Sequence, residues 1–533
     1  MHGFRVAVFL LLIHMAMAAP GSWQLLMNDS GIASMHTVVL HTGTVLFLDR
    51  TNVGPSHIRL ADGNCRNSTS EMVSPYDCFA HSVEFTPGPN TVRPLTIQTD
   101  TWCSSGAVVA DGTLVQTGGD FDGSNKIRYF KPCASGANCD WAEDSTTTLQ
   151  TRRWYATNQV LADGSILVVG GQNVFTYEFV PGRPAGQVAL PFLQETHKVF
   201  GDDQNLYPFL HLLPSGNVFI FARRDSILLD PNSGNILRKY PSIEGEPRNY
   251  PTQGSSVMLP LDNADGFTKA TILVCGGAND NAYSDPKTQY PASQTCGLLE
   301  ATAADPQWTM LNMPFPRVMS DMILLPNGRV LLINGAQKGS AGWEFASDPA
   351  LNPVIYNPTD RSFEVQAGTY IPRMYHSTAV LLPSAQILVA GSNTHQFYTF
   401  KEPYPTELRV EAFLPDYLHS SFDSQRPTVK SAPSQIAYGS TFVMTVTVPA
   451  PKGGFQLRLA STPWATHSFS QGQRQLALAI GMVTITDVDE YSITATAPPH
   501  AAVAPAGYYM LFAVQNDVPG FASWVQVIWN QPN

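Results

Sequence analysis

Three side chains able to bind a metal or to carry an electron occupy the same place in a repeating sequence pattern. Each repeat has an apolar stretch, a turn that usually contains Gly, and a second apolar stretch. Eight residues before the turns of three repeats stand a thiol, a phenol and an imidazole, those of Cys103, Tyr155 and His376, and Tyr375 adjoins the last of them. Nitrogen and oxygen ligands of this kind favour Cu2+ over calcium or a thiolate zinc site. The pattern therefore indicates a copper site.

The same place in the other repeats holds less reactive residues: Ser34, Tyr207, Gln253 and Met319. We interpret these as strand or pocket lining, because most buried Tyr, Cys and Met side chains serve packing alone. A single Tyr or Cys in this place would be interpreted in the same way. It is the combination of three reactive types that favours a functional site.

The repeats themselves predict an all-β fold. Their turns fall at Thr42, Asp111, Asp163, Ser215, Leu261, Asn327 and Ser384. Two consecutive intervals are 52 residues long and several second strands end in Gly-Gly, which is typical of kelch-type β-propellers. We expect a seven-bladed β-propeller over residues 23–420, with the reactive residues opening the innermost strands. Cys103, Tyr155 and His376 would then face one another around the axis.

Residues 426–533 follow a different pattern, without Gly-Gly. Alternating strands are predicted over Thr441–Val448, Phe455–Leu459, Gly481–Thr486, Tyr491–Thr496 and Tyr508–Val514. Short strands of this kind are typical of a small immunoglobulin-like β-sandwich. We therefore expect a C-terminal β-sandwich after the propeller.

The chain has seven cysteines. Their spacing suggests the local pairs Cys65 with Cys78, Cys133 with Cys139 and Cys275 with Cys296, although other pairings remain open. If these six pair, Cys103 is left over. An unpaired cysteine in a secreted protein is a candidate reactive thiol.

Residues 1–18 have the features of a secretory signal peptide. A short basic head is followed by an apolar centre from Val6 to Ile13 and by the small residues Ala16-Met17-Ala18. We expect a secreted, extracellular monomer with no later membrane-spanning segment. Asn28 and Asn67 each begin an Asn-x-Ser/Thr sequence and would accept N-linked glycans in that compartment.

The charge distribution argues against a nucleic-acid partner. The net charge is -11, and the 31 Lys and Arg residues are dispersed along the chain. Binding to nucleic acid needs clustered basic residues, so we expect no such function.

Four segments resemble the active-site motifs of glyoxal oxidases, which are copper-radical enzymes related to galactose oxidase. They are Trp102–Gly106, Arg152–Asn158, Pro372–Ser377 and Thr466–Ser470. The similarity extends from Trp23 to the end of the chain. Details such as Asp49-Arg50-Thr51 look closest to the plant-type glyoxal (aldehyde) oxidases.

This resemblance implies a role for each residue. Tyr155, joined to Cys103 by a thioether, would carry a radical beside one copper ion. His376, His467 and Tyr155 would be equatorial copper ligands, with Tyr375 as the axial tyrosine. Because His467 belongs to the predicted sandwich, a loop of that domain would have to reach into the propeller channel. Without the resemblance we would take His467 for a surface residue.

Two further positions are compared with galactose oxidases. Arg317 fills the place of their substrate-binding arginine, so the resemblance implies a contact with substrate. Their Trp that covers the cross-linked tyrosine is missing after Gly170-Gly171, and Phe175 is a candidate replacement.

The implied reaction oxidises a small aldehyde, such as glyoxal or methylglyoxal, to a carboxylic acid and reduces O2 to H2O2. One alternative is a primary alcohol oxidase of the galactose oxidase kind. Another is a non-catalytic kelch propeller that binds glycans or proteins, which the complete set of Cys, Tyr and His residues disfavours.

Overall fold

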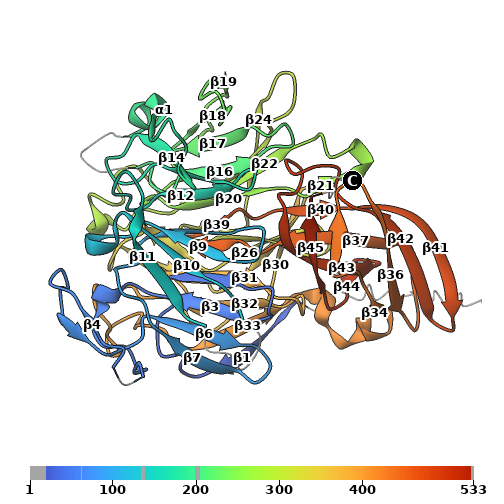
Figure 1. The fold of residues 1–533 in the computed structure, drawn as a ribbon, viewed down its shortest axis with the longest axis horizontal. Helices are drawn as coiled ribbons and strands as arrows, with labels where there is room; N and C mark the ends of the chain where they lie inside the picture. The colour runs from blue at the N-terminus through green and yellow to red at the C-terminus, as the bar shows by residue number, and fades with distance from the viewer. Residues whose placement is uncertain (1–19, 62, 134–138, 198–203, 530–533) are drawn as a thin grey trace, which may run out of the picture.

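The structure, a computed structural model, describes residues 20–61, 63–133, 139–197 and 204–529. Most of its regular structure is β-strand (Figure 1). The predicted signal peptide, residues 1–18, lies outside the described residues. None of the helices in those ranges has the length and apolar character needed to cross a bilayer. The helical segments are α1 (Pro191–Glu195), η1 (Thr51–Val53), η2 (Phe121–Gly123), η3 (Asn263–Asp265), η4 (Pro286–Thr288), η5 (Asp416–Leu418) and η6 (Ser420–Gln425).

The first part of the chain forms a β-propeller, in which antiparallel sheets surround a central axis (Figure 1). The inner strands, which are neighbours around that axis, are β2 (His36–Val39), β8 (Ser105–Val108), β12 (Thr157–Val160), β16 (Phe209–Leu212), β20 (Gly254–Met258), β25 (Asp321–Leu324) and β31 (Ser377–Leu381). They are short and almost fully buried, and several of them carry buried polar residues such as Asn158 and Thr378 beside their apolar ones.

Each inner strand is followed outwards by further strands of its sheet. These are β3 (Val45–Leu48), β6 (Ser82–Thr86) and β7 (Thr91–Leu95) beside β2; β9 (Leu114–Thr117), β10 (Lys126–Phe130) and β11 (Trp141–Thr148) beside β8; β13 (Ile166–Val169), β14 (Thr176–Val180) and β15 (Val188–Ala189) beside β12; β17 (Val218–Ala222), β18 (Asp225–Leu229) and β19 (Ile236–Lys239) beside β16; β22 (Thr271–Gly276), β23 (Thr295–Glu300) and β24 (Trp308–Asn312) beside β20; β26 (Val330–Ile333), β29 (Val354–Asn357) and β30 (Ser362–Val365) beside β25; and β32 (Ile387–Gly391), β33 (Val410–Leu414) and β1 (Ser22–Met27) beside β31. Two small ribbons pair β4 (Arg66–Asn67) with β5 (Tyr76–Asp77) and β27 (Ala336–Gly339) with β28 (Ala346–Pro349).

The strand β1 closes the propeller. It pairs antiparallel with β33, so that Ser22 lies opposite Leu414. One sheet therefore contains both the first described strand and the last strands of the propeller, and this pairing joins the two ends of the ring.

The turn between an inner strand and the next strand shows why the repeats contain Asp and Gly. In the turn after β12 the Asp163 carboxylate accepts a hydrogen bond from the Ser165 amide at 3.0 Å. Gly164 has a φ of 83°, a conformation that glycine adopts without steric cost. These two residues thus form the tight turn that connects β12 to β13.

The C-terminal part consists of two further sheets beside the propeller (Figure 1). One contains β34 (Thr428–Ser431), β36 (Thr441–Thr447), β42 (Glu490–Thr496) and β41 (Ala479–Asp487); the other contains β21 (Leu261–Asp262), β40 (Gln475–Ala477), β37 (Phe455–Ser461), β43 (Gly507–Gln515), β45 (Ser523–Ile528) and β35 (Gln435–Ala437), with β44 (Val518–Pro519) on β43. The predicted strands match β36, β37, β41, β42 and β43 to within two residues. Side chains from both sheets and from the propeller form one continuous apolar core.

A hairpin of the C-terminal part enters the propeller. Its strands, β38 (Trp464–Thr466) and β39 (Phe469–Gln471), extend the sheet of β2, and His36 lies opposite Thr466. Figure 1 shows β39 among the propeller strands, apart from the other C-terminal strands. The strand β21 of the propeller in turn pairs with β40. Each part therefore contributes a strand to a sheet of the other, and this pairing joins the C-terminal part to the propeller.

The three expected disulfides are present. They join Cys65 to Cys78, Cys133 to Cys139 and Cys275 to Cys296. Cys103 has a free thiol and is buried. The local pairing predicted from spacing is confirmed.

Candidate metal centre

The reactive residues stand in the turns that lead into the inner strands, not in the strands as predicted. Cys103 and Tyr155 precede the first residues of β8 and β12 by two positions, and His376 immediately precedes β31. Their φ angles are 49°, 65° and 61°, in the left-handed region that non-glycine residues rarely occupy. Such residues cost roughly 1 kcal/mol or more each and are typical of functional sites.

Backbone hydrogen bonds connect these turns from one sheet to the next. The Tyr155 amide donates to the Cys103 carbonyl at 3.0 Å, and the Tyr207 amide donates to the Tyr155 carbonyl at 3.0 Å. The Met319 amide donates to the Gln253 carbonyl in the same manner at 2.7 Å. Neighbouring sheets therefore hold their corresponding residues at one level around the axis.

Buried arginines fix the start of several inner strands. Nη1 of Arg153 donates to the Gly170 carbonyl at 2.7 Å, and Nη1 of Arg373 donates to the Gly391 carbonyl at 2.8 Å. In both sheets the acceptor lies at or just after the end of the second strand. Arg248 makes the corresponding bond to a glycine carbonyl. Each of these three residues, called a clamping arginine below, bonds the turn before an inner strand to its own sheet. The residue two positions after the arginine then lies near the propeller axis.

At the axis a sulfur atom and two imidazoles converge. Ligand atoms of Cys103, His376 and His467 all lie within 4.8 Å of one another, and the Cys103 Sγ is 3.2 Å from His467 Nε2. Neither ring nitrogen of His376 has a hydrogen-bond partner among the described residues, although the side chain is buried. Leaving buried nitrogens unpaired costs about 1–3 kcal/mol each. A neutral imidazole has one nitrogen with a free lone pair, which a metal ion would bind. The residues therefore fit a metal centre.

The tautomer of His467 follows from its partners. Its Nδ1 lies 2.7 Å from the Thr466 hydroxyl, which lies 2.7 Å from His36 Nδ1. His36 Nε2 is 3.1 Å from the carbonyl of Thr101, which only accepts, so Nε2 carries the proton and Nδ1 accepts from Thr466. The threonine oxygen then accepts from His467 Nδ1–H. The Nε2 lone pair of His467 is therefore directed into the centre.

Three phenols meet beside the imidazoles. The Tyr155 hydroxyl donates to the Tyr250 hydroxyl at 3.2 Å, and the Tyr250 and Tyr375 hydroxyls are 2.9 Å apart. The Tyr375 ring stacks on His376 with centroids 3.8 Å apart. The Tyr155 and Tyr375 rings are each 5.9 Å from the His467 ring. The structure thus gathers the predicted residues and adds Tyr250 to them.

Burial keeps all of these groups neutral. It raises the pKa of the Cys103 thiol and of the Tyr155 and Tyr375 phenols well above their usual values. It lowers the pKa of both His376 and His467 well below the usual value near 6.5. The neutral imidazoles can offer their lone pairs to a metal, and a nearby cation would favour loss of the phenolic protons.

The ring of Tyr155 is covered, but not by Phe175. Tyr250 stacks on it with a centroid distance of 4.5 Å, and Trp154 lies against it at 4.5 Å. Phe175 instead contacts His197 edge-on and packs in a separate apolar cluster. Tyr250 and Trp154 therefore shield the phenol that the resemblance would make redox-active.

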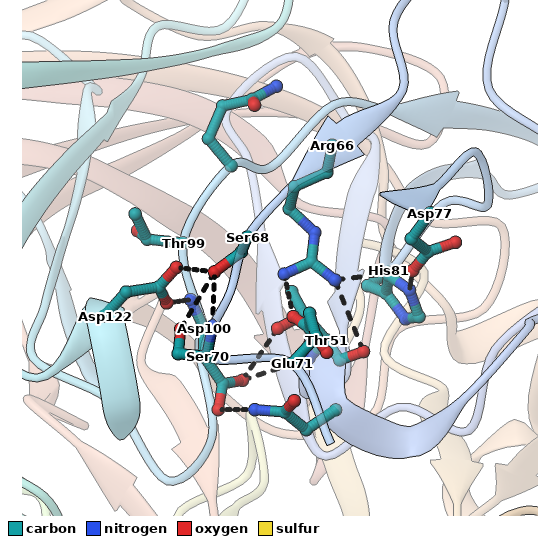
Figure 2. A network of polar contacts seen from close by, with 12 residues as sticks. Thr51, Arg66, Ser68, Ser70, Glu71, Asp77, His81, Thr99, Asp100 and Asp122 are labelled. Atoms are coloured by element: carbon teal, nitrogen blue, oxygen red, sulfur yellow. Dashed lines mark hydrogen bonds and ion pairs between the residues drawn. The ribbon is translucent and has the colours of Figure 1, made fainter. Parts of the chain in front are cut away.

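A buried polar network holds the segment before Cys103. The Asp100 carboxylate accepts hydrogen bonds from the Thr51 amide and hydroxyl and from the Trp102 amide. Asp122 accepts from the Asp100 amide and from Ser68, a residue of the loop closed by the first disulfide (Figure 2). That loop is therefore coupled through two carboxylates to the residues beside the thiol.

A cavity of about 350 Å³ opens next to Tyr375. Met374, Tyr375 and His395 are among its lining residues, and His395 bonds Glu344 at 3.0 Å. The cavity therefore lies against one of the phenol-bearing residues of the centre.

Arg317 is engaged elsewhere. Its guanidinium is buried and donates to the backbone carbonyls of Asn334, at 2.7 Å, and Asn352. It thus occupies the same place in its sheet as Arg153 does in another. These contacts favour a structural role, and its contact with substrate stays a prediction. The two predicted glycan acceptors, Asn28 and Asn67, are both exposed.

Tyr250 was missed because the repeats were aligned on their turns. An alignment on the clamping arginines finds it, since Arg153-Trp154-Tyr155, Arg248-Asn249-Tyr250 and Arg373-Met374-Tyr375 share one Arg-x-Tyr pattern. In the repeat that contains β20, counting eight residues back from the turn reaches Gln253, which lies three residues after Tyr250. His467 had no such signal, because it belongs to a hairpin from outside the repeats.

Comparison with known proteins identifies the class. Residues 35–417 match the family described as glyoxal oxidase N-terminus, and residues 426–527 match the galactose oxidase-like early set domain. A fungal alcohol oxidase of the AA5 family, solved in complex with copper, superposes with a TM-score of 0.73 over 95% of this chain and 99% of its own at 20% identity. The fold is therefore that of galactose oxidase-like proteins, a β-propeller with a C-terminal early set domain.

Sequence relatives narrow this class further. The aldehyde oxidase GLOX of Vitis pseudoreticulata is 49% identical, with 96% of this chain and 97% of that protein covered. The aldehyde oxidase GLOX1 of Arabidopsis thaliana is 39% identical, with 96% and 85% covered. The chain belongs to the glyoxal oxidase family.

Proposed function

We propose that the protein is a copper-radical oxidase that converts small aldehydes to carboxylic acids, consuming water and O2 and releasing H2O2. The observation that carries the proposal is the convergence of Cys103, His376 and His467 within 4.8 Å beside the phenols of Tyr155 and Tyr375. The relatives named aldehyde oxidases support the choice of substrate class.

The residues present would hold one copper ion. His376 and His467 offer nitrogen lone pairs, and Tyr155 and Tyr375 offer phenolic oxygens. The bound ion would supply one-electron redox chemistry, and a radical on Tyr155 would accept the second of the two electrons that the aldehyde loses. A thioether between Cys103 Sγ and the Tyr155 ring would form by loss of two hydrogens to O2, and its sulfur would make the ring easier to oxidise.

Tyr375 and Tyr155 would handle the hydrogens of the substrate. The hydrated aldehyde would approach through the cavity beside Tyr375, whose deprotonated oxygen would take the hydroxyl proton as general base. The oxygen of the Tyr155 radical would then take the hydrogen bound to carbon. The stacking of Tyr375 on His376 and the cover of Tyr250 and Trp154 over Tyr155 would hold both phenols in place for these transfers.

The wider organisation is part of the same proposal. We infer seven blades over residues 23–420, a sandwich over 426–533, and secretion of a monomer to the extracellular space after removal of residues 1–18. Glycans would be carried at Asn28 and Asn67. The disulfides and the exposure of both asparagines support this environment.

A peroxide-coupled assay with metal analysis tests the function. We expect about one copper per chain and H2O2 formation with glyoxal and methylglyoxal. Faster turnover of galactose or benzyl alcohol would instead favour a primary alcohol oxidase. A purified protein that takes up no copper would contradict both activities and favour a binding propeller.

A further inference from the structure

Tyr250 occupies a position between the two functional phenols. Its hydroxyl is 3.2 Å from that of Tyr155 and 2.9 Å from that of Tyr375, and its ring stacks on Tyr155. The side chain is 7% exposed. A residue needed only for packing would not require a hydroxyl at the point where two other hydroxyls meet.

The number of protons on the three phenol oxygens explains why the position of Tyr250 matters. In the metal-free protein each of the three oxygens carries one proton. If Tyr155 and Tyr375 give up theirs to bind a cation, Tyr250 holds the single remaining proton between two negatively charged acceptors. Its hydroxyl can donate to one of them at a time, so the hydrogen bonding of the two phenolates becomes mutually dependent.

We propose that Tyr250 is a further residue of the reaction centre, whose neutral hydroxyl hydrogen-bonds the oxygens of Tyr155 and Tyr375 and sets how easily Tyr155 loses an electron. A donor stabilises the phenolate, which is charged, more than the neutral radical. Donation to Tyr155 therefore makes its oxidation harder, and donation to Tyr375 relieves that effect. This inference rests on the proposed function, because it requires that Tyr155 is the group oxidised.

The substitution Tyr250→Phe removes the hydroxyl and keeps the stacked ring. Tyr207→Phe is the matched control, because Tyr207 is also a buried phenol packed edge-on against Tyr155, at 5.5 Å, but its hydroxyl bonds the Ser104 carbonyl instead. The copper-loaded, cross-linked proteins are equilibrated with mixtures of ferricyanide and ferrocyanide. One electron passes from Tyr155 to ferricyanide, while the proton of Tyr250 stays on its oxygen. The radical is measured by its visible absorption.

We expect Tyr250→Phe to keep its copper and its cross-link mass but to raise the ratio of oxidised to reduced Tyr155 about tenfold at a fixed mixture, as for loss of one hydrogen bond to a charged group. Tyr207→Phe should match the wild type. Should Tyr250→Phe fold poorly, 3-fluorotyrosine at position 250 keeps the size and strengthens the donor, and must shift the ratio the other way.

The possible failures are distinguishable. A wild-type protein in which no radical can be generated overturns the proposed function and this inference with it. A normal wild-type radical with an unchanged ratio in Tyr250→Phe, or an equal change in Tyr207→Phe, overturns the role of Tyr250 alone.

Discussion

His376 and His467 differ in how their nitrogens are used, and the difference bears on what the site binds. His467 is held by Thr466 on one side and faces the Cys103 sulfur on the other. The ring nitrogens of His376 have no hydrogen-bond partner in the described part of the chain, and its ring is held by contacts with Tyr375 and His467. The first imidazole is thus oriented by the protein alone, whereas the proposed copper ion would be the polar partner of the second.

Replacing Cys103 by Ser is expected to leave the fold intact and to remove the cross-link. A hydroxyl is nearly the size of a thiol, but it cannot form the thioether with Tyr155. Intact mass after copper loading in air should fall by about 2 Da in the wild type, the mass of the two hydrogens lost, and stay constant in the variant. An equal fall in both proteins would show that the oxidation occurs elsewhere.

Replacing Tyr375 by Phe should separate copper binding from proton transfer. His376, His467 and Tyr155 would still hold the ion, but the general base would be lost. General bases contribute about 10²–10⁴-fold, so we expect turnover with glyoxal to fall by at least about 100-fold. Copper content and the visible absorption of the radical should persist. Unchanged steady-state kinetics would remove Tyr375 from this role.

From the sequence alone we predicted the part of the candidate site that the repeats encode. Cys103, Tyr155 and His376 share a place in the repeats, and backbone hydrogen bonds between neighbouring turns give that place a physical meaning. His467 was reached only through family resemblance. Tyr250 escaped because the turn-based count does not allow for the three extra residues between its arginine and the turn of its repeat, compared with the repeat of Arg153.

At the scale of single elements, the clamping arginines do more than the strand residues to position the site. The predicted innermost strands exist, but they begin one or two residues after the reactive side chains. Hydrophobic patterning finds a strand and cannot find the left-handed turn before it, since that turn is imposed by contacts with neighbouring sheets and with an arginine.

The substitution Arg153→Met tests this clamp. The Arg153 guanidinium is buried and pairs with Glu178 at 2.7 Å, so its loss would leave a buried carboxylate unpaired. Breaking one side of a buried pair costs about 3–5 kcal/mol. Chemical denaturation should show a loss of this size, together with weaker copper binding because Tyr155 follows two residues later.

The matched control for that variant is Lys239→Met, which removes an exposed ion pair with Glu195. Exposed pairs contribute about 0–1 kcal/mol, so the free energy of unfolding should change little. Comparable losses in both variants would mean that the buried arginine has no special structural role.

At the scale of the whole molecule, buried histidines outside the metal centre make stability depend on pH. Burial lowers the pKa of His36 and of His211 to about 3. Below pH 6.5 the unfolded chain takes up protons at these residues and the folded chain does not. The free energy of unfolding should therefore fall as the pH is lowered from about 6.5 towards 3, by up to about 1.4 kcal/mol per pH unit for each histidine.

The variant His211→Gln isolates one of these contributions. We expect the difference in unfolding free energy between pH 7 and pH 5 to shrink by about 2 kcal/mol relative to the wild type, as measured by denaturant titration at both values. His500→Gln, which replaces an exposed histidine, should leave the difference unchanged. If both variants behave alike, the burial of His211 does not control the acid sensitivity.

The β38–β39 hairpin has a consequence for biosynthesis. The propeller residues of the metal centre leave the ribosome first, but His467 and the strand that extends the β2 sheet follow almost a hundred residues after Tyr375. A newly made propeller therefore lacks His467 and the β38–β39 hairpin until those residues are translated. The full set of proposed copper ligands would therefore exist only after the β38–β39 hairpin has been made, when the propeller residues of the site are already translated.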